Sequence, residues 1–316
     1  MKLICIFSLF VFCSVQLNAQ CCSAGNPVAG TGFESVSAKG EWQISTSAKY
    51  SLSDQYFYHD SKIDNPYILK SSFLYQNLWT NFSISNRISM SAEAGYFYDK
   101  SQMLSFGDDP FKLGTSGIGD VEVGLKIIAI KKIKPVTQLA FTAGSKIPVG
   151  AFHQSVDGIT VPVSLQPSSG AFRWKAGAVF QRLSAKQNRG FAAQAMFELS
   201  SEINKDYLVY RYGPFLRLSA GYMQRILPKM SMSLFGVFDL RGKDTREFEQ
   251  EVAGTGSYSV LVQPWIQYAF RSDRILFFNA ECPVYRYFNG ELLGNKFAAQ
   301  IGFRVGFNNC IKKKSE

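Results

Sequence analysis

One stretch of the chain, Ser116 to Ile130, constrains the fold because two classes of side chain alternate along it. Its apolar residues fall on one side of an extended chain: Val121, Val123, Leu125 and Ile127. The positions between them are charged or small: Asp120, Glu122, Gly124 and Lys126. A period of two residues is that of a β-strand, whereas a helix would mix the two classes on one stripe. The stretch therefore predicts a strand with one aliphatic and one charged face, in either a soluble sandwich or a membrane barrel with a wet lumen.

The N-terminus predicts export. Lys2 precedes an apolar run from Leu3 to Val15, and Leu17-Asn18-Ala19 offers a cleavage site of small residues. This is the pattern of a signal peptide, so residues 1–19 are excluded from the fold. Cys21 follows closely, but Gln20 before it is not the small residue that lipidation requires, which argues against a lipid anchor.

The mature chain is apolar without having long apolar runs. The full sequence is 46% hydrophobic and 15% aromatic, yet no stretch after the signal peptide approaches the roughly 18 consecutive apolar residues of a transmembrane helix. Alternating segments recur instead, and their number is about twelve, each near the length that crosses a bilayer at a tilt. Aromatic residues lie near the predicted strand ends, where interfacial girdles belong: Tyr50, Trp79, Tyr96, Tyr98, Phe180, Tyr222, Tyr268, Phe270 and Phe307.

The connections between these segments alternate in length. Tight turns, as at 83–87 and 227–229, alternate with long loops, as at 100–117, 148–170 and 242–256. The sequence therefore predicts an all-β fold, a closed antiparallel transmembrane β-barrel of about twelve strands, with short periplasmic turns and long extracellular loops. The barrel spans residues 41–307, between an irregular N-terminal periplasmic segment (20–40) and a basic C-terminal tail (308–316). A secreted soluble sandwich is the alternative.

The inward faces of the predicted strands carry charges of both signs. These are the candidate lumen-lining residues: Lys49, Glu93, Asp120, Glu122, Lys126, Lys146, Arg173, Lys175, Glu198, Arg217, Asp239, Arg241, Glu281 and Arg304. Mixed charge argues against a selectivity filter of one sign. The same residues fit two interpretations: a lined pathway, or ion pairs that fill a narrow barrel.

The sequence gives little support for catalysis, metal binding or nucleic-acid binding. The two histidines, His59 and His153, both fall in predicted loops. We therefore expect that the protein is not an enzyme and that it has no catalytic site, metal site or cofactor. The formal net charge is +10, with basic clusters at 131–134 and 312–314. In an exported chain we expect no nucleic acid as partner, and these clusters fit solvated turns or contacts with anionic head groups.

Four cysteines remain after the signal peptide, and they allow three pairings if all are oxidised. Cys21, Cys22 and Cys310 would all lie at the periplasmic end, where Cys310 could pair with Cys21 or Cys22 and tie the N-terminal segment under the barrel. Free thiols throughout are the alternative. Cys282 shares the face of Phe278 and Ala280, which predicts a small lipid-facing residue.

Three segments resemble one known family: SGIGDVEVGLK, SKIPVG with the later QPSSGAFRWKAGAVFQ, and CPVYRYFNGELLGNKFAAQIGFRVGF. The family is the MetA-pathway phenol-degradation group of outer-membrane transporters, and the resemblance covers most of residues 41–307. It implies a barrel that transports small molecules, in some members linked to aromatic compounds, and it transfers no substrate residues. One departure is that nine residues follow Phe307, whereas barrel chains often end on the aromatic of the last strand.

These observations predict a barrel in the bacterial (Gram-negative) outer membrane, in contact with lipid, that acts as a transporter or passive channel for small hydrophobic or aromatic molecules. The alternative is a closed structural or binding barrel that presents its extracellular loops. The sequence predicts neither the solute nor the oligomeric state.

Overall fold

The computed structural model describes residues 38–64, 67–106, 109–156, 158–205 and 208–308. The predicted signal peptide, most of the predicted N-terminal segment, and the tail beyond residue 308 lie outside these ranges. So do Cys21, Cys22 and Cys310, and the pairing expected for them stays a prediction.

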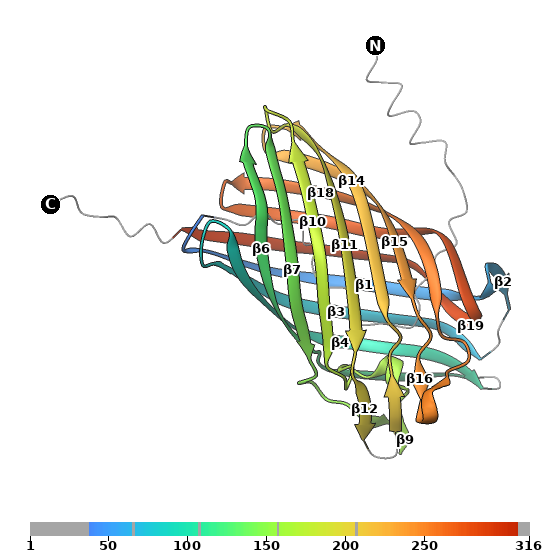
Figure 1. Ribbon diagram of the computed structural model, residues 1–316. Coiled ribbons are helices and arrows are strands. Elements are labelled where there is room, and N and C mark those ends of the chain that lie inside the picture. The colour runs from blue at the N-terminus through green and yellow to red at the C-terminus, as the bar shows by residue number, and fades with distance from the viewer. Residues whose placement is uncertain (1–37, 65–66, 107–108, 157, 206–207, 309–316) are drawn as a thin grey trace, which may run out of the picture.

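A single antiparallel sheet closes on itself to form a barrel (Figure 1). Each strand pairs with the next along the chain, and β19 returns to pair with β1. The eleven strands of the wall are β1 (Glu41–His59), β3 (Ile68–Ser83), β4 (Ile88–Phe106), β6 (Val121–Ile133), β7 (Val136–Ile147), β10 (Arg173–Leu183), β11 (Arg189–Ser200), β14 (Phe215–Leu227), β15 (Met230–Arg241), β18 (Ser257–Arg271) and β19 (Arg274–Asn308).

The last of these, β19, crosses the wall twice. Its first part, 274–288, pairs with β18, and its second part, 288–308, pairs with β1. The chain reverses at Gly290, whose φ of +125° lies in a region that L side chains rarely adopt. Counting its two parts separately, the described chain crosses the wall twelve times. The predicted closed barrel of about twelve strands is confirmed.

The two ends of the barrel differ in their connections. At one end, the turn end, the connections are tight: 84–87, 134–135, 184–188, 228–229 and 272–273. The opposite end, the loop end, carries every longer excursion. It holds the short elements β2 (Ser61–Ile63), β5 (Asp109–Ile118), β8 (Ser155–Val156), β9 (Ile159–Thr160), η1 (Val163–Leu165), β12 (Glu202–Lys205), β13 (Leu208–Arg211), β16 (Thr245–Arg246), η2 (Glu247–Glu249) and β17 (Gln250–Glu251).

The prediction of a long loop at 100–117 is wrong. β4 continues to Phe106, and β5 pairs back along it from Phe106↔Asp109 to Tyr96↔Ile118. A hairpin pairs backbone groups that an irregular loop would leave to water. It therefore extends the wall at the loop end, where loop strands β12, β13, β16 and β17 form a second small sheet.

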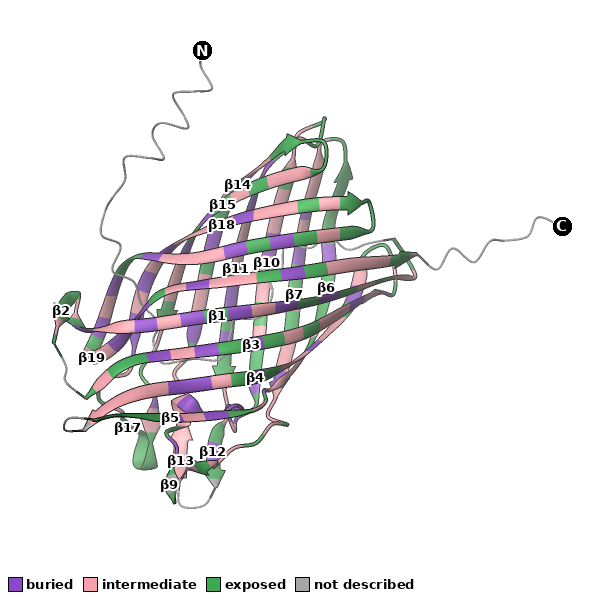
Figure 2. Cartoon of the chain, turned by 180° about the vertical axis from the view of Figure 1, so that it is seen from behind, coloured by how far each residue is buried: buried purple, intermediate pink, exposed green. Residues whose placement is uncertain are grey.

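Exposed and buried residues alternate along the wall strands (Figure 2). On β6, Val123, Leu125 and Ile127 are 41%, 37% and 44% exposed on the outer face, as the alternation predicts. A bulge between Ile128 and Ile130 then shifts the register, so Ile128 is buried inside while Ile130 lies outside. The outer wall is a continuous apolar surface, which only lipid can cover over this extent.

The predicted girdle aromatics lie mostly on this outer wall. Tyr96, Tyr98, Tyr222, Tyr268 and Phe270 are all exposed, and so are Tyr50 and Phe307. The placement of Trp79 in the girdle is wrong, because its ring lies 5.8 Å from the Arg304 guanidinium inside the barrel. β3 carries large apolar residues on both faces, so alternation alone does not distinguish its two sides.

The interior contains aromatic clusters as well as charges. Phe73, Tyr75 and Phe97 form one cluster, and Trp265 with Phe277 belongs to another. The Tyr75 ring lies over Gly95, where an added Cβ would come within 2.3 Å of it. Among the described residues, no helix is long and apolar enough to cross a membrane.

Candidate functional site

A layer of ion pairs crosses the interior near the loop end. Its ion-paired members come from eight wall strands, and most are nearly buried. They are both cations and carboxylates: Lys49, Lys146, Arg173, Lys175, Arg217, Glu122, Glu198, Asp239 and Glu281. Glu93 of β4 is buried beside Glu122, its partner in the strand register. Charges this far from water need partners, because a single unpaired buried charge costs several kcal/mol.

Glu198 on β11 is the centre of the largest group. Its carboxylate lies 3.1 Å from Arg173, 3.5 Å from Lys146 and 3.8 Å from Lys175. Lys175 also donates to Glu122 on β6, two strands away. A contact across an intervening strand requires that both side chains point into the barrel.

Two further pairs complete the layer. Lys49 of β1 contacts Glu281 of β19 at 3.0 Å. Arg217 of β14 donates from Nε and Nη2 to the two carboxylate oxygens of Asp239 on β15, both at 2.7 Å. A bidentate pair of this kind fixes orientation as well as distance. The layer therefore links adjacent and next-but-one strands of the wall with pairs of defined geometry.

Above this layer, residues 161–171 fold over the loop end of the interior; we call them the inward segment. Val161, Leu165, Gln166, Ser168 and Ser169 are at most 2% exposed. Gly170 has a φ of +70° and the Phe152 ring packs against it, so a side chain there would be strained and crowded. This burial is unusual for a loop, because its backbone polar groups must find partners inside the protein.

Side chains of the wall supply those partners. Lys100 of β4 donates to the Gln166 carbonyl at 2.8 Å, and Thr115 of β5 donates to the Leu165 carbonyl. Tyr212 donates to the Ser169 carbonyl at 3.0 Å. The inward segment is therefore fixed to three places around the wall.

Asp120, just before β6, holds the inward segment most firmly. Its carboxylate accepts bonds from the Ser168 hydroxyl at 2.6 Å, the Ser169 amide at 3.0 Å and the Ser169 hydroxyl at 2.5 Å. Hydrogen bonds to a charged group are about twice as strong as neutral ones. Asp120 therefore makes more hydrogen bonds to the inward segment than Lys100, Thr115 or Tyr212 does.

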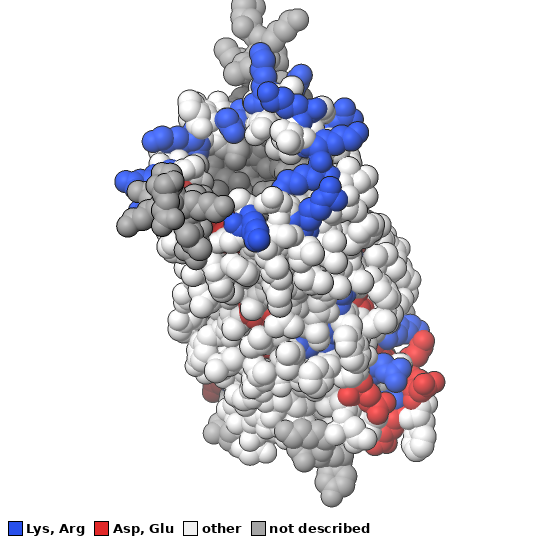
Figure 3. Space-filling model, turned by 60° about the vertical axis from the view of Figure 1, so that its left-hand side comes forward, with Lys and Arg blue, Asp and Glu red and all other residues white. Residues whose placement is uncertain are grey.

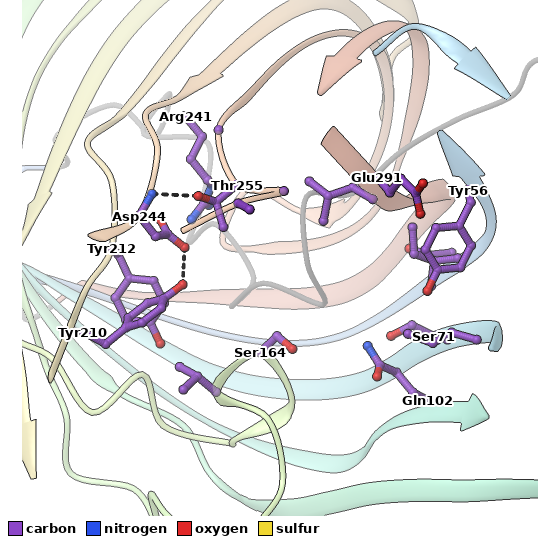
Figure 4. Close-up of a pocket in the computed structure, with 18 residues that line it drawn as sticks. Tyr56, Ser71, Gln102, Ser164, Tyr210, Tyr212, Arg241, Asp244, Thr255 and Glu291 are labelled. Atoms are coloured by element: carbon purple, nitrogen blue, oxygen red, sulfur yellow. Dashed lines mark hydrogen bonds between the residues drawn. The ribbon is translucent and has the colours of Figure 1, made fainter. Parts of the chain in front are cut away.

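A cavity of about 470 Å³ lies between the inward segment and the outer loops (Figure 4). Its apolar lining includes Ile68, Val163, Leu292 and Leu293. Figure 4 shows Glu291 and Tyr56 on one side and Tyr210, Tyr212 and Asp244 on the other. Apolar walls with a few polar groups are typical of small-molecule sites, and the volume lies in their usual range.

Asp244 organises one wall of this outer cavity. It accepts hydrogen bonds from the Tyr210 hydroxyl and, at 2.7 Å, from the Gly213 amide, while its own amide donates to Thr255 at 3.0 Å. Burial, and then the charge of Asp244, raises the pKa of Tyr210 above its usual value. Burial also raises the pKa of Tyr212 to about 12. Both phenols are therefore neutral hydrogen-bond donors at physiological pH.

A second cavity, of about 290 Å³, opens toward the turn end. Arg304, Trp265 and Phe235 line it together with several amide side chains and the turn-side residues Arg189 and Arg225. Arg304 lies 5.8 Å from both the Trp79 and the Phe277 ring. The outer and turn-side cavities share no lining residue, and the ion-pair layer and inward segment lie between them.

Two of the remaining predicted lumen residues lie elsewhere in the interior. Arg241 lines the outer cavity over the Phe215 ring at 5.2 Å. Lys126 is on the inner face of β6, below Glu122. Cys282 is a half-buried free thiol of β19. That a solute passes any of these residues stays a prediction.

Sequence reasoning missed the inward segment and the interior aromatics. The polar residues QPSSG of 166–170 have the composition of an ordinary loop. The one signal that they lie near the lumen is that the strand directly after them begins with charged residues. The interior aromatics had a weak signal, since Phe73 and Tyr75 lie on the same face of a poorly alternating strand.

Neither histidine takes part in a catalytic arrangement that the described residues show. His59 Nδ1 lies 2.5 Å from the Tyr287 hydroxyl, and His153 packs edge-on against Phe152. Within the described ranges, no group of three or more His, Cys, Asp or Glu side chains is placed to hold a metal ion.

A closed antiparallel barrel with an apolar outer wall, exposed girdle aromatics and a charged interior defines the class: a transmembrane β-barrel of the bacterial outer-membrane type. Comparison with solved structures agrees. The chain is similar to the COG4313 outer membrane channel from Pseudomonas putida F1, with a TM-score of 0.70 and 11% identity over 89% of this chain and 100% of that chain. At this identity the likeness is one of fold, and it is the fold that the family resemblance implied.

Other barrels are less similar. The transport unit of the autotransporter AIDA-I from Escherichia coli gives a TM-score of 0.45 at 10% identity, over 89% of this chain and 93% of that chain. The CymD monoaromatic hydrocarbon channel gives 0.43 at 10% identity, over 86% and 90%. No family model matches the sequence, and no curated protein matches it.

Proposed function

We propose that this barrel is an outer-membrane channel for small molecules, and that the inward segment is its gate. The observation that carries the proposal is the order of features along the axis. A cavity open to the outer loops is followed by the inward segment, the ion-pair layer and a turn-side cavity. At Lys100, Thr115 and Asp120 the wall holds the segment by side-chain hydrogen bonds, which can break without opening the wall.

A disulfide across the gate tests this directly. The Ser168 hydroxyl and the Asp120 carboxylate are 2.6 Å apart, so cysteines at both positions fall within reach of a disulfide. We expect the double variant Asp120→Cys, Ser168→Cys, with the native cysteines replaced by serine, to conduct in planar bilayers when reduced and to lose conductance when oxidised. Equal conductance in the two redox states would rule out the segment as gate.

A matched control places the disulfide outside the path. Thr245 of β16 and Glu251 of β17 are directly opposed in the antiparallel pairing of these two strands on the loop rim, so their Cβ atoms are close enough for a disulfide. In the same cysteine-free background, the pair Thr245→Cys, Glu251→Cys is expected to conduct equally when oxidised and reduced. A loss of conductance in this control as well would mean that oxidation closes the barrel by another route.

We propose that the solutes are small hydrophobic or aromatic molecules. Support comes from the outer cavity, whose lining combines Ile68, Leu292 and Leu293 with the phenols of Tyr210 and Tyr212. An apolar ring with one polar substituent fits such a lining. Titration calorimetry with phenol tests it: we expect Leu293→Trp, which fills the cavity, to abolish binding, and Leu276→Trp on the outer wall to leave it unchanged.

The second candidate function is a closed binding barrel that presents its outer loops. The buried ion pairs and the inward segment favour it, because together they fill the interior at the loop end. In that case phenol binds as above, but neither the wild-type chain nor the reduced double-cysteine variant conducts. Binding and conductance measured on the same preparations therefore separate the two functions.

A further inference from the structure

The turn end carries a ring of basic side chains that transport does not require. Each of its five hairpin turns bears or adjoins an exposed lysine or arginine, and these form the turn ring: Arg87, Lys134, Lys186, Lys229, Arg271 and Arg274. Figure 3 shows Lys and Arg side chains distributed around the hollow of this end. The ring follows the circumference rather than one face.

Carboxylates at the turn end are too few to neutralise the ring. Among the residues that the structure describes there, only Glu41 and Asp273 are acidic, and Asp273 lies 3.8 Å from Arg274. The loop end differs, because Glu247, Glu249 and Glu251 lie there in η2 and β17, and Glu251 pairs with Lys243. The turn ring is therefore a net positive surface that an external anion would stabilise.

The depth of the turn ring follows from the aromatic residues next to it. Phe270 directly precedes Arg271 and contacts Phe303, with ring centroids 6.4 Å apart. Trp42 is exposed on the outer wall and packs against Phe82 at 4.8 Å, next to the turn that holds Arg87. Exposed aromatics of a barrel lie at the membrane–water interface. The turn ring thus lies one step farther out, at the level of lipid head groups.

We propose that the turn ring binds the phosphate groups of anionic phospholipids in the leaflet around the turn end. Ammonium and guanidinium groups bind phosphate by charge-assisted hydrogen bonds. A partner that reaches all five turns at once has to surround the barrel, which lipids do and one globular protein does not. This inference is independent of the proposed transport function, since it concerns the outer rim alone.

Two exposed tryptophans provide a matched pair of reporters. Trp42 lies beside the turn ring, whereas Trp174, at the start of β10, lies at the loop end. Trp79 and Trp265 are interior and common to both variants. The variant Trp174→Phe keeps Trp42 and reports on the turn end, whereas the variant Trp42→Phe keeps Trp174 and reports on the loop end. Each variant is refolded as the full chain into phosphatidylcholine vesicles, and the signal is the quenching of tryptophan fluorescence by brominated phosphatidylglycerol.

We expect phosphatidylglycerol to be preferred over phosphatidylcholine about fivefold at Trp42, and not at all at Trp174. The preference should fall as salt rises to about 0.5 M, because exposed charges are screened. Equal quenching preference at the two tryptophans would overturn the proposal, as would a preference at Trp42 that salt does not change.

Charge removal gives the second test. The triple variant Arg87→Gln, Arg271→Gln, Arg274→Gln should lose most of the preference at Trp42. The control triple variant Lys62→Gln, Lys70→Gln, Lys112→Gln removes the same charge from the loop end and should keep it. All six positions are exposed, so folding is preserved. A loss that is equal in the two triple variants would show a net-charge effect and would contradict a binding surface at the ring.

Discussion

The two halves of the interior share one wall and differ in what fills them. Toward the loop end, residues 161–171 and the Glu198 group close the interior with mostly buried residues, and the charges of the Glu198 group are paired. Toward the turn end, Arg304 and long amide side chains surround a cavity of about 290 Å³. The same strands run through both halves, so the difference comes from a loop and from buried charges, and not from the barrel architecture.

This comparison separates stability from closure. The wall is fixed by its backbone pairing along the whole length of each strand. The loop-end half adds electrostatic contacts that are costly to break singly, while the turn-end half adds apolar contacts, such as those of Trp265 with Phe277. We therefore expect substitutions to have effects that decrease from the ion-pair layer, through the inward segment, to the turn-side cavity.

The largest effect is expected for Glu198→Gln. The change leaves Lys146, Arg173 and Lys175 without their shared carboxylate, and breaking a buried pair in this way lowers the free energy of unfolding by about 3–5 kcal/mol. Urea unfolding in detergent, followed by circular dichroism, measures the loss. For comparison, Lys112→Gln breaks an exposed pair with Asp99 and should cost at most about 1 kcal/mol. Similar costs for both changes would mean that the layer is not buried from water.

Next in size is Asp120→Ala. It removes three hydrogen bonds that hold Ser168 and Ser169, each worth about 1.5–3 kcal/mol when the acceptor is charged. A net shift of only 1.4 kcal/mol raises the ratio of open to closed channels about tenfold. Single-channel recording gives this ratio, and Glu249→Ala on the exposed rim is the control. An unchanged open probability would show that Asp120 does not hold the channel closed.

A smaller effect is expected for Tyr212→Phe. The change removes one neutral hydrogen bond to the Ser169 carbonyl and keeps the ring over the Arg173 guanidinium, 4.2 Å away. A bond of this kind contributes about 1 kcal/mol, so we expect the open-to-closed ratio to rise about fivefold. An effect as large as that of Asp120→Ala would mean that the tyrosine and the carboxylate act as one coupled unit.

The smallest effect is expected in the turn-side half. Gln267→Ala removes an amide from the lining of the turn-side cavity, and its effects on unfolding should stay within about 0.5 kcal/mol. Gating should be unchanged, and only the single-channel current should rise slightly as the cavity widens. A change in open probability here would show that part of the gate lies in the turn-end half, which contradicts a gate formed by the inward segment alone.

The sequence predicts the barrel wall better than the ion pairs, aromatic side chains and loop segment that fill the interior. Alternation along Val121 to Ile127 is a local signal, and the same signal in successive strands is enough to predict closure. The partners of Glu198 depend on register and on side chains two strands away, so no local pattern contains them. The predicted position of Trp79 is wrong for a different reason. Its strand carries large apolar residues on both faces, so alternation does not show which face points inward. The fold of residues 161–171 depends on Asp120 and Lys100, far away in sequence.

The seam between β1 and β19 has a consequence for biogenesis. β1 pairs along its whole length with the second part of β19, from Glu41↔Asn308 to His59↔Phe288, and the two are the first and last strands of the wall. Until the final strand is made, β1 has an unsatisfied edge that can pair with another chain. Contacts between distant parts of a sequence also form slowly, because their chain entropy must be lost first. The step that completes the cylinder is therefore the one most exposed to aggregation, and a nascent barrel of this kind needs protection until its C-terminal strand arrives.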